Sequence, residues 1–129
     1  MAKILVIDDD EQFCEFLEKV LIRDGNEVAT AHDGEDGIRR FERILPDLVI
    51  TDIFMPNKNG IEVITELQRM NSDVSVIAIS GRQLQQLEAL DFALLLGARR
   101  ILEKPFTRDQ LLGTVSQALV GQWVNLVRR

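Results

Sequence analysis

The segment Ile4-Leu5-Val6-Ile7-Asp8-Asp9-Asp10 joins four consecutive apolar residues to three consecutive carboxylates. A short aliphatic run without polar interruption is typical of a strand that is covered on both faces, as in a parallel sheet. Two further runs, which are almost continuously apolar, cover residues 48–51 and 74–79, and Asp52 directly follows the first of them. These runs predict a buried parallel sheet whose strands lead into polar residues.

Five strand-like segments alternate with stretches of helical spacing, and the segments are 4–7, 27–31, 48–51, 74–79 and 99–102. The apolar stripes that follow them are Phe13, Phe16, Leu17, Val20 and Leu21; Ile38, Phe41 and Ile44; Ile61, Ile64, Leu67 and Met70; Leu84, Leu87, Leu90, Leu94 and Leu95; and Leu111, Leu112, Val115 and Leu119. Gly25, Pro46 and Gly97 stand where the first, second and fourth helices should end. Five βα units predict a single-domain (βα)5 α/β fold with helices on both faces of the sheet. The strand order 2-1-3-4-5 is taken from flavodoxin-like doubly wound sheets with the same alternation.

The composition agrees with one folded domain and excludes several classes of function. The chain has 129 residues, of which 46% are hydrophobic and 28% charged, and a net charge of -6. This acidic balance argues against direct nucleic-acid binding by these residues. Cys14 is the only cysteine, so no internal disulfide can form, and we expect it to pack beside a helix in a reducing compartment. The apolar N-terminal run is too short for a signal peptide, and no stretch approaches membrane-spanning length, so we expect a cytoplasmic protein.

Chemically useful side chains follow the strands at their carboxyl ends, where open α/β sheets bind ligands. Asp8 and Asp9 follow the first strand, Asp52 the third, Ser80 the fourth and Lys104 the fifth. Clustered carboxylates repel one another, and a Mg²⁺ ion relieves that repulsion while leaving room for phosphate oxygens. Lys104 and Ser80 add a cation and a hydroxyl, and a carboxylate is a nucleophile for phosphoryl groups. The set therefore indicates Mg²⁺-dependent phosphoryl chemistry.

Four motifs in the same order resemble response-regulator receiver domains of two-component signalling over residues 3–120. They are Ile7-Asp8-Asp9, Thr51-Asp52 with Met55-Pro56 and Gly60, Ser80-Gly81, and Lys104-Pro105-Phe106. The resemblance implies that Asp52 is the phosphoacceptor. It also implies that Asp9, Asp52 and the Phe54 carbonyl bind Mg²⁺ directly, and that Asp8 acts mainly through water. Ser80 resembles the switch hydroxyl and Lys104 the phosphate-pairing lysine, with a cis bond to Pro105.

The resemblance further implies the partners and the manner of signalling. A sensor histidine kinase or a histidine phosphotransfer protein would supply the phosphoryl group, and the chain itself would be a switch rather than an enzyme. The output would leave through the face formed by residues 84–95, 99–102 and 111–119, toward an effector domain or protein or a second copy of the chain. We assign residues 1–120 to the receiver, and residues 121–129 to a helix extension or the start of a linker.

Three positions depart from the family pattern or vary within it. Ile101 stands where receivers usually carry Tyr, Phe or His, so we expect the switch to be transmitted differently in detail. Phe54 and Arg82 flank the pocket, and our hypothesis is that bulky Phe54 limits access of water and lengthens the life of the phosphoryl group.

Simpler interpretations exist for single residues. Asp9 or Asp10 would also serve as a helix cap, and for Asp10 the cap alone is a sufficient role. Gly60 would serve as a plain turn residue. We expect His32 on the surface, on an edge away from the site. An alternative is a phosphatase of the haloacid dehalogenase type. Such an enzyme needs a second Asp where this chain has Phe54, which argues against it. A degenerate receiver, acting as a phosphorylation-independent interaction module, is the remaining alternative.

Overall fold

The computed structural model describes residues 1–55, 60–71, 73–81 and 97–128, with residues 120–128 described by their backbone alone. Within them, five parallel strands form one sheet in the order β2-β1-β3-β4-β5. The strands are β1 (Lys3–Ile7), β2 (Glu27–Ala31), β3 (Leu48–Asp52), β4 (Ser75–Ser80) and β5 (Arg100–Glu103). The predicted order is confirmed, and each observed strand lies within one residue of its predicted bounds.

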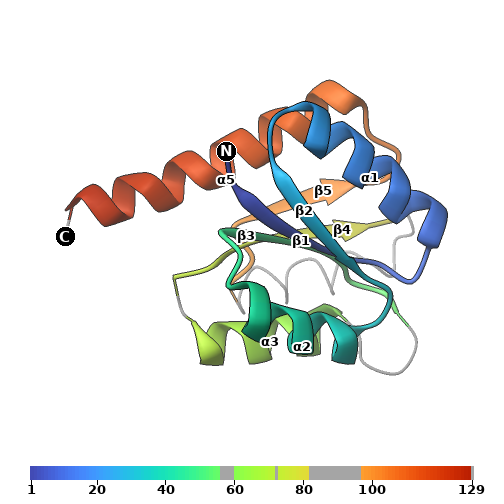
Figure 1. The fold of residues 1–129 in the computed structure, drawn as a ribbon, viewed down its shortest axis with the longest axis horizontal. Coiled ribbons are helices and arrows are strands. Elements are labelled where there is room, and N and C mark those ends of the chain that lie inside the picture. Colours follow the sequence, from blue (N-terminus) through green and yellow to red (C-terminus); the bar gives the residue numbers. More distant parts are fainter. Residues whose placement is uncertain (56–59, 72, 82–96, 129) are drawn as a thin grey trace.

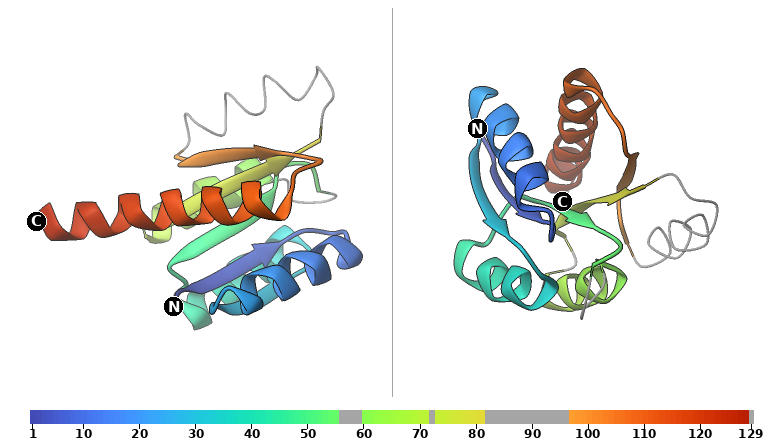
Figure 2. Two further views of the ribbon diagram at one scale, coloured as in Figure 1. Left: turned by 90° about the horizontal axis from the view of Figure 1, so that it is seen from above. Right: turned by 90° about the vertical axis from the view of Figure 1, so that its right-hand side faces the viewer.

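Helices cover both faces of this sheet, as Figures 1 and 2 show. The described helices are α1 (Glu11–Arg23), α2 (Gly34–Ile44), α3 (Gly60–Met70) and α5 (Arg108–Arg128). α1 and α5 lie on one face, and α2 and α3 lie on the other. The predicted helix at 84–95 and the pocket-flanking Arg82 fall outside the described residues. α5 continues past Gly121 without a break.

The two faces of the strands carry two separate hydrophobic clusters. Alternate strand residues such as Val6, Ile50 and Ile79 pack under α1 and α5, while Leu5 and Val49 pack under α2 and α3. Because both faces are covered, β3 and β4 are buried at every position. This double burial explains why their sequences are apolar nearly without interruption rather than alternating.

The helix ends follow local chemistry. The Asp10 carboxylate caps α1 by accepting a hydrogen bond from the Phe13 N–H at 3.1 Å. Gly25 follows α1 with φ at 92°, the left-handed conformation that glycine adopts without strain. α2 ends at Ile44, and Leu45 takes a left-handed φ of 51° before Pro46. The predicted roles of Gly25 and Pro46 as helix terminators are therefore confirmed.

Within the part of the chain that the structure describes, two residues of the predicted apolar stripes are exposed. Phe16 is 42% exposed and Met70 is 41% exposed, whereas Val63, outside the predicted stripe of α3, is fully buried. The predicted stripes of α1 and α3 differ slightly from the faces that pack on the sheet. Helical spacing gives a periodicity but not the angle at which a helix lies on the sheet. Among the described residues, no helix combines the length and apolarity that a bilayer crossing requires.

Candidate functional site

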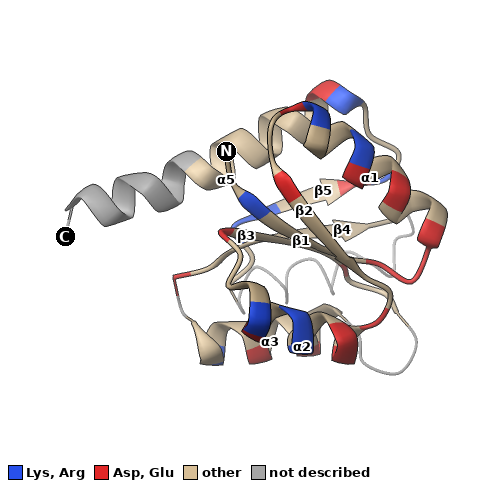
Figure 3. Ribbon diagram, viewed as in Figure 1, with Lys and Arg blue, Asp and Glu red and all other residues tan. Residues whose placement is uncertain are grey.

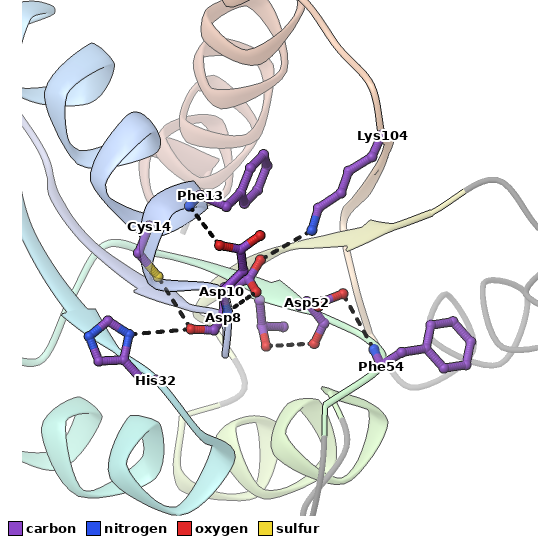
Figure 4. A network of polar contacts seen from close by, with 9 residues as sticks. Asp8, Asp10, Phe13, Cys14, His32, Asp52, Phe54 and Lys104 are labelled. Carbon is purple, nitrogen blue, oxygen red and sulfur yellow. Dashed lines mark hydrogen bonds and ion pairs between the residues drawn. The ribbon is translucent and has the colours of Figure 1, made fainter.

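The sheet gathers the predicted site residues at one edge. Asp8 follows β1 directly, and Asp52 is the last residue of the adjacent strand β3. Ile7 is paired with Thr51, so the next residues, Asp8 and Asp52, leave the sheet side by side. Ser80 ends β4 and Lys104 follows β5. The carboxyl ends of four strands therefore supply one site, and Figure 4 draws the polar contacts around Asp8, Asp52 and Lys104.

Three carboxylates lie close enough together to hold a metal ion. Asp8, Asp9 and Asp52 each offer an oxygen, and these atoms lie within 4.8 Å of one another. Asp8 is 1% exposed and Asp52 is 8% exposed, while Asp9 is open to solvent. Figure 3 shows that Asp and Glu residues continue from this edge into the first turns of α1. Such a set of oxygen ligands with one open side suits a hard divalent cation that retains water.

The electrostatics of the cluster agree with that use. Burial and, after it, the Asp8 charge raise the pKa of Asp52 to about 6, against the opposing effects of Lys104 and the Phe54 N–H. Burial also raises the pKa of Asp8, against the Asp10 N–H and Lys104. The protein alone therefore stabilises the two buried negative charges incompletely. A divalent cation at the cluster would supply the missing positive charge.

Lys104 reaches the carboxylate cluster from the loop after β5. Its Nζ lies 3.4 Å from Asp8 Oδ2, and 28% of its side chain is exposed. Its backbone N–H donates to the Ser80 carbonyl at 2.7 Å, which ties the loop after β5 to the end of β4. The Lys104–Pro105 bond is cis, as the family resemblance implied. The Ser80 hydroxyl donates to the Gly81 carbonyl at 2.8 Å.

Asp8 is also a centre of backbone contacts, one of which the sequence did not predict. Its carboxylate accepts from the Asp10 N–H at 2.9 Å, and its carbonyl accepts from Cys14 Sγ at 3.3 Å. His32 Nδ1 lies 3.4 Å from the same carbonyl oxygen. His32 is exposed as expected, but the prediction that it lies away from the site is wrong. β2 is the neighbour of β1, so the residue after β2 arrives beside Asp8.

Cys14 has the packing role that its place in α1 predicts. It is 1% exposed, and burial together with the nearby Asp8 and Asp10 charges raises the pKa of its thiol to about 12. A thiol with so high a pKa is a poor nucleophile at neutral pH.

Gly60 is more than a turn residue. A Cβ at this position would collide with the carbonyl oxygen of Asp52 and lie 2.7 Å from the Ile53 Cα. The Gly60 N–H donates to the Ile53 carbonyl at 2.7 Å. The start of α3 thus packs directly against the backbone of Asp52, the predicted phosphoacceptor. Only glycine permits so close an approach.

The positions that depart from the family pattern lie as follows. Ile101 is half-buried and packs against the cluster under α2 and α3. The Phe54 N–H donates to Asp52 Oδ1 at 3.4 Å, but the residue is 45% exposed and its ring points away from that carboxylate (Figure 4). In this arrangement the ring does not cover Asp52. Our hypothesis that Phe54 limits access of water would require the ring to cover it. Arg82 lies outside the described residues.

The sequence profile of the response regulator receiver domain matches residues 4–116. The chain belongs to this family, the receiver domains of two-component systems. Transcriptional regulatory protein PrrA of Mycobacterium tuberculosis is 37% identical over 117 residues, which cover 91% of this chain and 49% of the relative. The alkaline phosphatase synthesis transcriptional regulatory protein PhoP of Bacillus subtilis is 32% identical over 117 residues, covering 91% and 48%.

Solved structures agree with this assignment. A response regulator receiver domain protein from Clostridium thermocellum superposes with a TM-score of 0.90 at 32% identity, covering 96% of this chain and 98% of that one. A CheY-like receiver domain protein from Methanospirillum hungatei superposes with a TM-score of 0.91 at 26% identity, covering 97% and 98%. The chain spans about half the length of the curated relatives it matches.

Proposed function

We propose that this receiver accepts a phosphoryl group on Asp52 in a Mg²⁺-dependent reaction and thereby acts as a signalling switch. The observation that carries the proposal is the meeting of Asp8, Asp9 and Asp52 within 4.8 Å, with the Lys104 ammonium 3.4 Å from Asp8. A metal store would need the carboxylates alone. The cation placed beside them favours an anionic ligand, and a phosphoryl group fits both halves of the site.

The chemistry follows from these positions. An Asp52 carboxylate oxygen attacks the phosphorus of the donor, a new O–P bond forms, and the bond from phosphorus to the leaving group breaks with its electron pair going to that group. Asp8, Asp9, Asp52 and the Phe54 carbonyl would hold Mg²⁺, which supplies neutralising charge at the phosphoryl oxygens. The Lys104 ammonium pairs with one phosphoryl oxygen, and the Ser80 hydroxyl turns from the Gly81 carbonyl to another.

The donor and the output are proposed on the family's behaviour. A histidine kinase or a phosphotransfer protein would deliver the phosphoryl group from a histidine. The output face would include β5 and α5, between which a groove of about 540 Å³ is lined by Leu102, Phe106 and Gln110 among others. An effector domain, an effector protein or a second copy of the chain would bind there. We place the protein in the cytoplasm, as a switch without an enzymatic turnover of its own and without direct contact to nucleic acid or membrane.

Intact-mass measurement after incubation with a small phosphodonor tests the proposal. We expect an added mass of one phosphoryl group in the presence of Mg²⁺, and none when a chelator replaces the metal. Asp9→Asn should lose the adduct because it removes a candidate metal ligand.

Asp10→Asn is the matched control, since Asn caps a helix as well as Asp does and the Asp10 side chain belongs to the cap. This variant should still form the adduct. An adduct that forms equally well without Mg²⁺ would contradict the metal dependence. No adduct under any condition would leave the degenerate, interaction-only receiver as the better description.

A further inference from the structure

Phe13 contacts Lys104, the candidate phosphate-pairing lysine, although no site motif includes Phe13. The Lys104 Nζ lies 4.1 Å from the centroid of the Phe13 ring and 3.4 Å from Asp8 Oδ2. The ammonium is therefore placed between an aromatic face and a carboxylate, and Figure 4 shows the lysine extending toward both. A cation within about 6 Å of a ring centroid is attracted by the ring quadrupole.

The ring is held in place by its own neighbours. It packs edge-to-face against Phe106, with centroids 5.6 Å apart and planes at 77°. The exposed Phe16 ring lies farther from it, with centroids 6.2 Å apart and planes tilted by 34°, and is not the ring's support. The Phe13 N–H is fixed by the Asp10 cap at 3.1 Å. Phe106 lies two residues after Lys104. The aromatic contact thus joins the start of α1 to the loop that carries the lysine.

An aromatic partner suits this lysine for a physical reason. Lysine is a flexible chain with a strongly hydrated head, and a side chain that is 28% exposed has room to turn into solvent. The Asp8 carboxylate restrains it, but the same carboxylate is a candidate metal ligand and would be shared with a bound cation. The Phe13 ring attracts the ammonium without a charge, so it neither competes for the metal nor repels a phosphoryl anion.

We infer that Phe13 is a positioning residue that holds the Lys104 ammonium over the phosphoryl site, with Phe106 supporting its ring. The effect on phosphorylation rests on the proposed function. The contact between ring and ammonium does not, because it already exists in the unmodified protein.

The contact can be measured by NMR in the unphosphorylated protein. Protons above a ring face are shifted upfield, so the Lys104 ε-methylene signals should be upfield in the native protein. Phe13→Leu keeps apolar bulk but removes the ring, and it should return these signals to ordinary lysine positions. Phe16→Leu makes the same change one turn away from the ammonium and should leave them in place.

The rate of phosphorylation by a small phosphodonor gives the functional readout. Removing an attraction of this size predicts that Phe13→Leu slows the reaction about three- to tenfold. Phe13→Tyr, which restores a ring, should recover most of the loss, and Phe16→Leu should react as the native protein does. Mg²⁺ affinity should be unchanged in Phe13→Leu, because Phe13 offers no metal ligand.

The outcomes separate this inference from the proposed function. Unchanged Lys104 signals in Phe13→Leu, or a rate equal to that of the native protein, would overturn the role of Phe13. A slowed rate that Phe13→Tyr fails to recover would overturn it too, since the loss would then reflect packing rather than the ring. If the native protein accepts no phosphoryl group at all, the proposed function fails, while the NMR comparison still decides whether Phe13 holds the lysine.

Discussion

Asp52 is buried beside a second carboxylate, and this placement has a consequence for stability as well as for chemistry. Its pKa is raised to about 6 by burial and by the Asp8 charge. A carboxyl whose pKa is higher in the folded than in the unfolded protein favours folding in its protonated form. The contribution of Asp52 to the stability of the metal-free fold is therefore greatest below the ordinary pKa of 3.8, and it is lost as the pH rises through about 6.

Asp52→Asn should stabilise the metal-free protein at neutral pH. The amide carries no charge to bury and keeps an oxygen that can accept from the Phe54 N–H. The expected gain at pH 7 is about 1–3 kcal/mol in the free energy of unfolding. The gain should shrink between pH 6 and pH 4 and vanish below about pH 4, where the native carboxyl is protonated as well.

Urea unfolding with a chelator present, at pH 7 and again near pH 4, measures this difference directly. A variant less stable than the native protein at pH 7, or a gain that persists unchanged in acid, would show that the Asp52 charge does not strain the fold. Saturating Mg²⁺ should narrow the gap at pH 7 because the cation stabilises only the charged cluster.

α3 and the end of β3 meet at Gly60 without room for a side chain. Gly60→Ala places a Cβ against the Asp52 carbonyl and the Ile53 Cα, both of them backbone atoms that cannot rotate aside. We expect this variant to lose about 1–3 kcal/mol of stability through overpacking. Because the displaced backbone carries Asp52, its phosphorylation rate should also fall.

Gly113→Ala is the matched control for this substitution. Gly113 is exposed on α5, and a Cβ there would meet no atom within 4 Å. Alanine has the higher helix propensity, so this variant should gain about 0.5–1 kcal/mol. Thermal unfolding of both variants gives the comparison, and a Gly60→Ala protein as stable as Gly113→Ala would contradict the close approach at Asp52.

The strands and the residues at their ends could be predicted because burial on both faces writes an unbroken apolar run into the sequence. β3, for example, is predicted at residues 48–51 and observed at Leu48–Asp52, where every position is buried. The sequence did not predict the angle at which each helix lies on the sheet. Phe16, in the predicted stripe of α1, is therefore found exposed, and Val63, outside the predicted stripe of α3, is found buried. Contacts between residues distant in sequence were also missed, among them His32 beside the Asp8 carbonyl and Phe13 over Lys104.

The complete fold is what turns separate residues into a site. Asp8, Asp52, Ser80 and Lys104 come from four strands that are contiguous in the sheet, and the strand order brings their ends together. Each has an ordinary explanation by itself, as a cap, a turn or a surface residue. Ile101 is the position at which the transmission of the switch is expected to differ from other receivers, because an aliphatic side chain there packs without a ring.

The most direct test of this account is to locate the phosphoryl group on the chain. Protein treated with a small phosphodonor and Mg²⁺ is reduced with borohydride, which converts an aspartyl phosphate to homoserine and releases the phosphate. Peptide sequencing by mass spectrometry then reads which residue was modified. The account predicts homoserine at position 52, and only in samples that contained Mg²⁺. Homoserine at Asp8 or Asp9, or unaltered aspartate at all three positions, would contradict it.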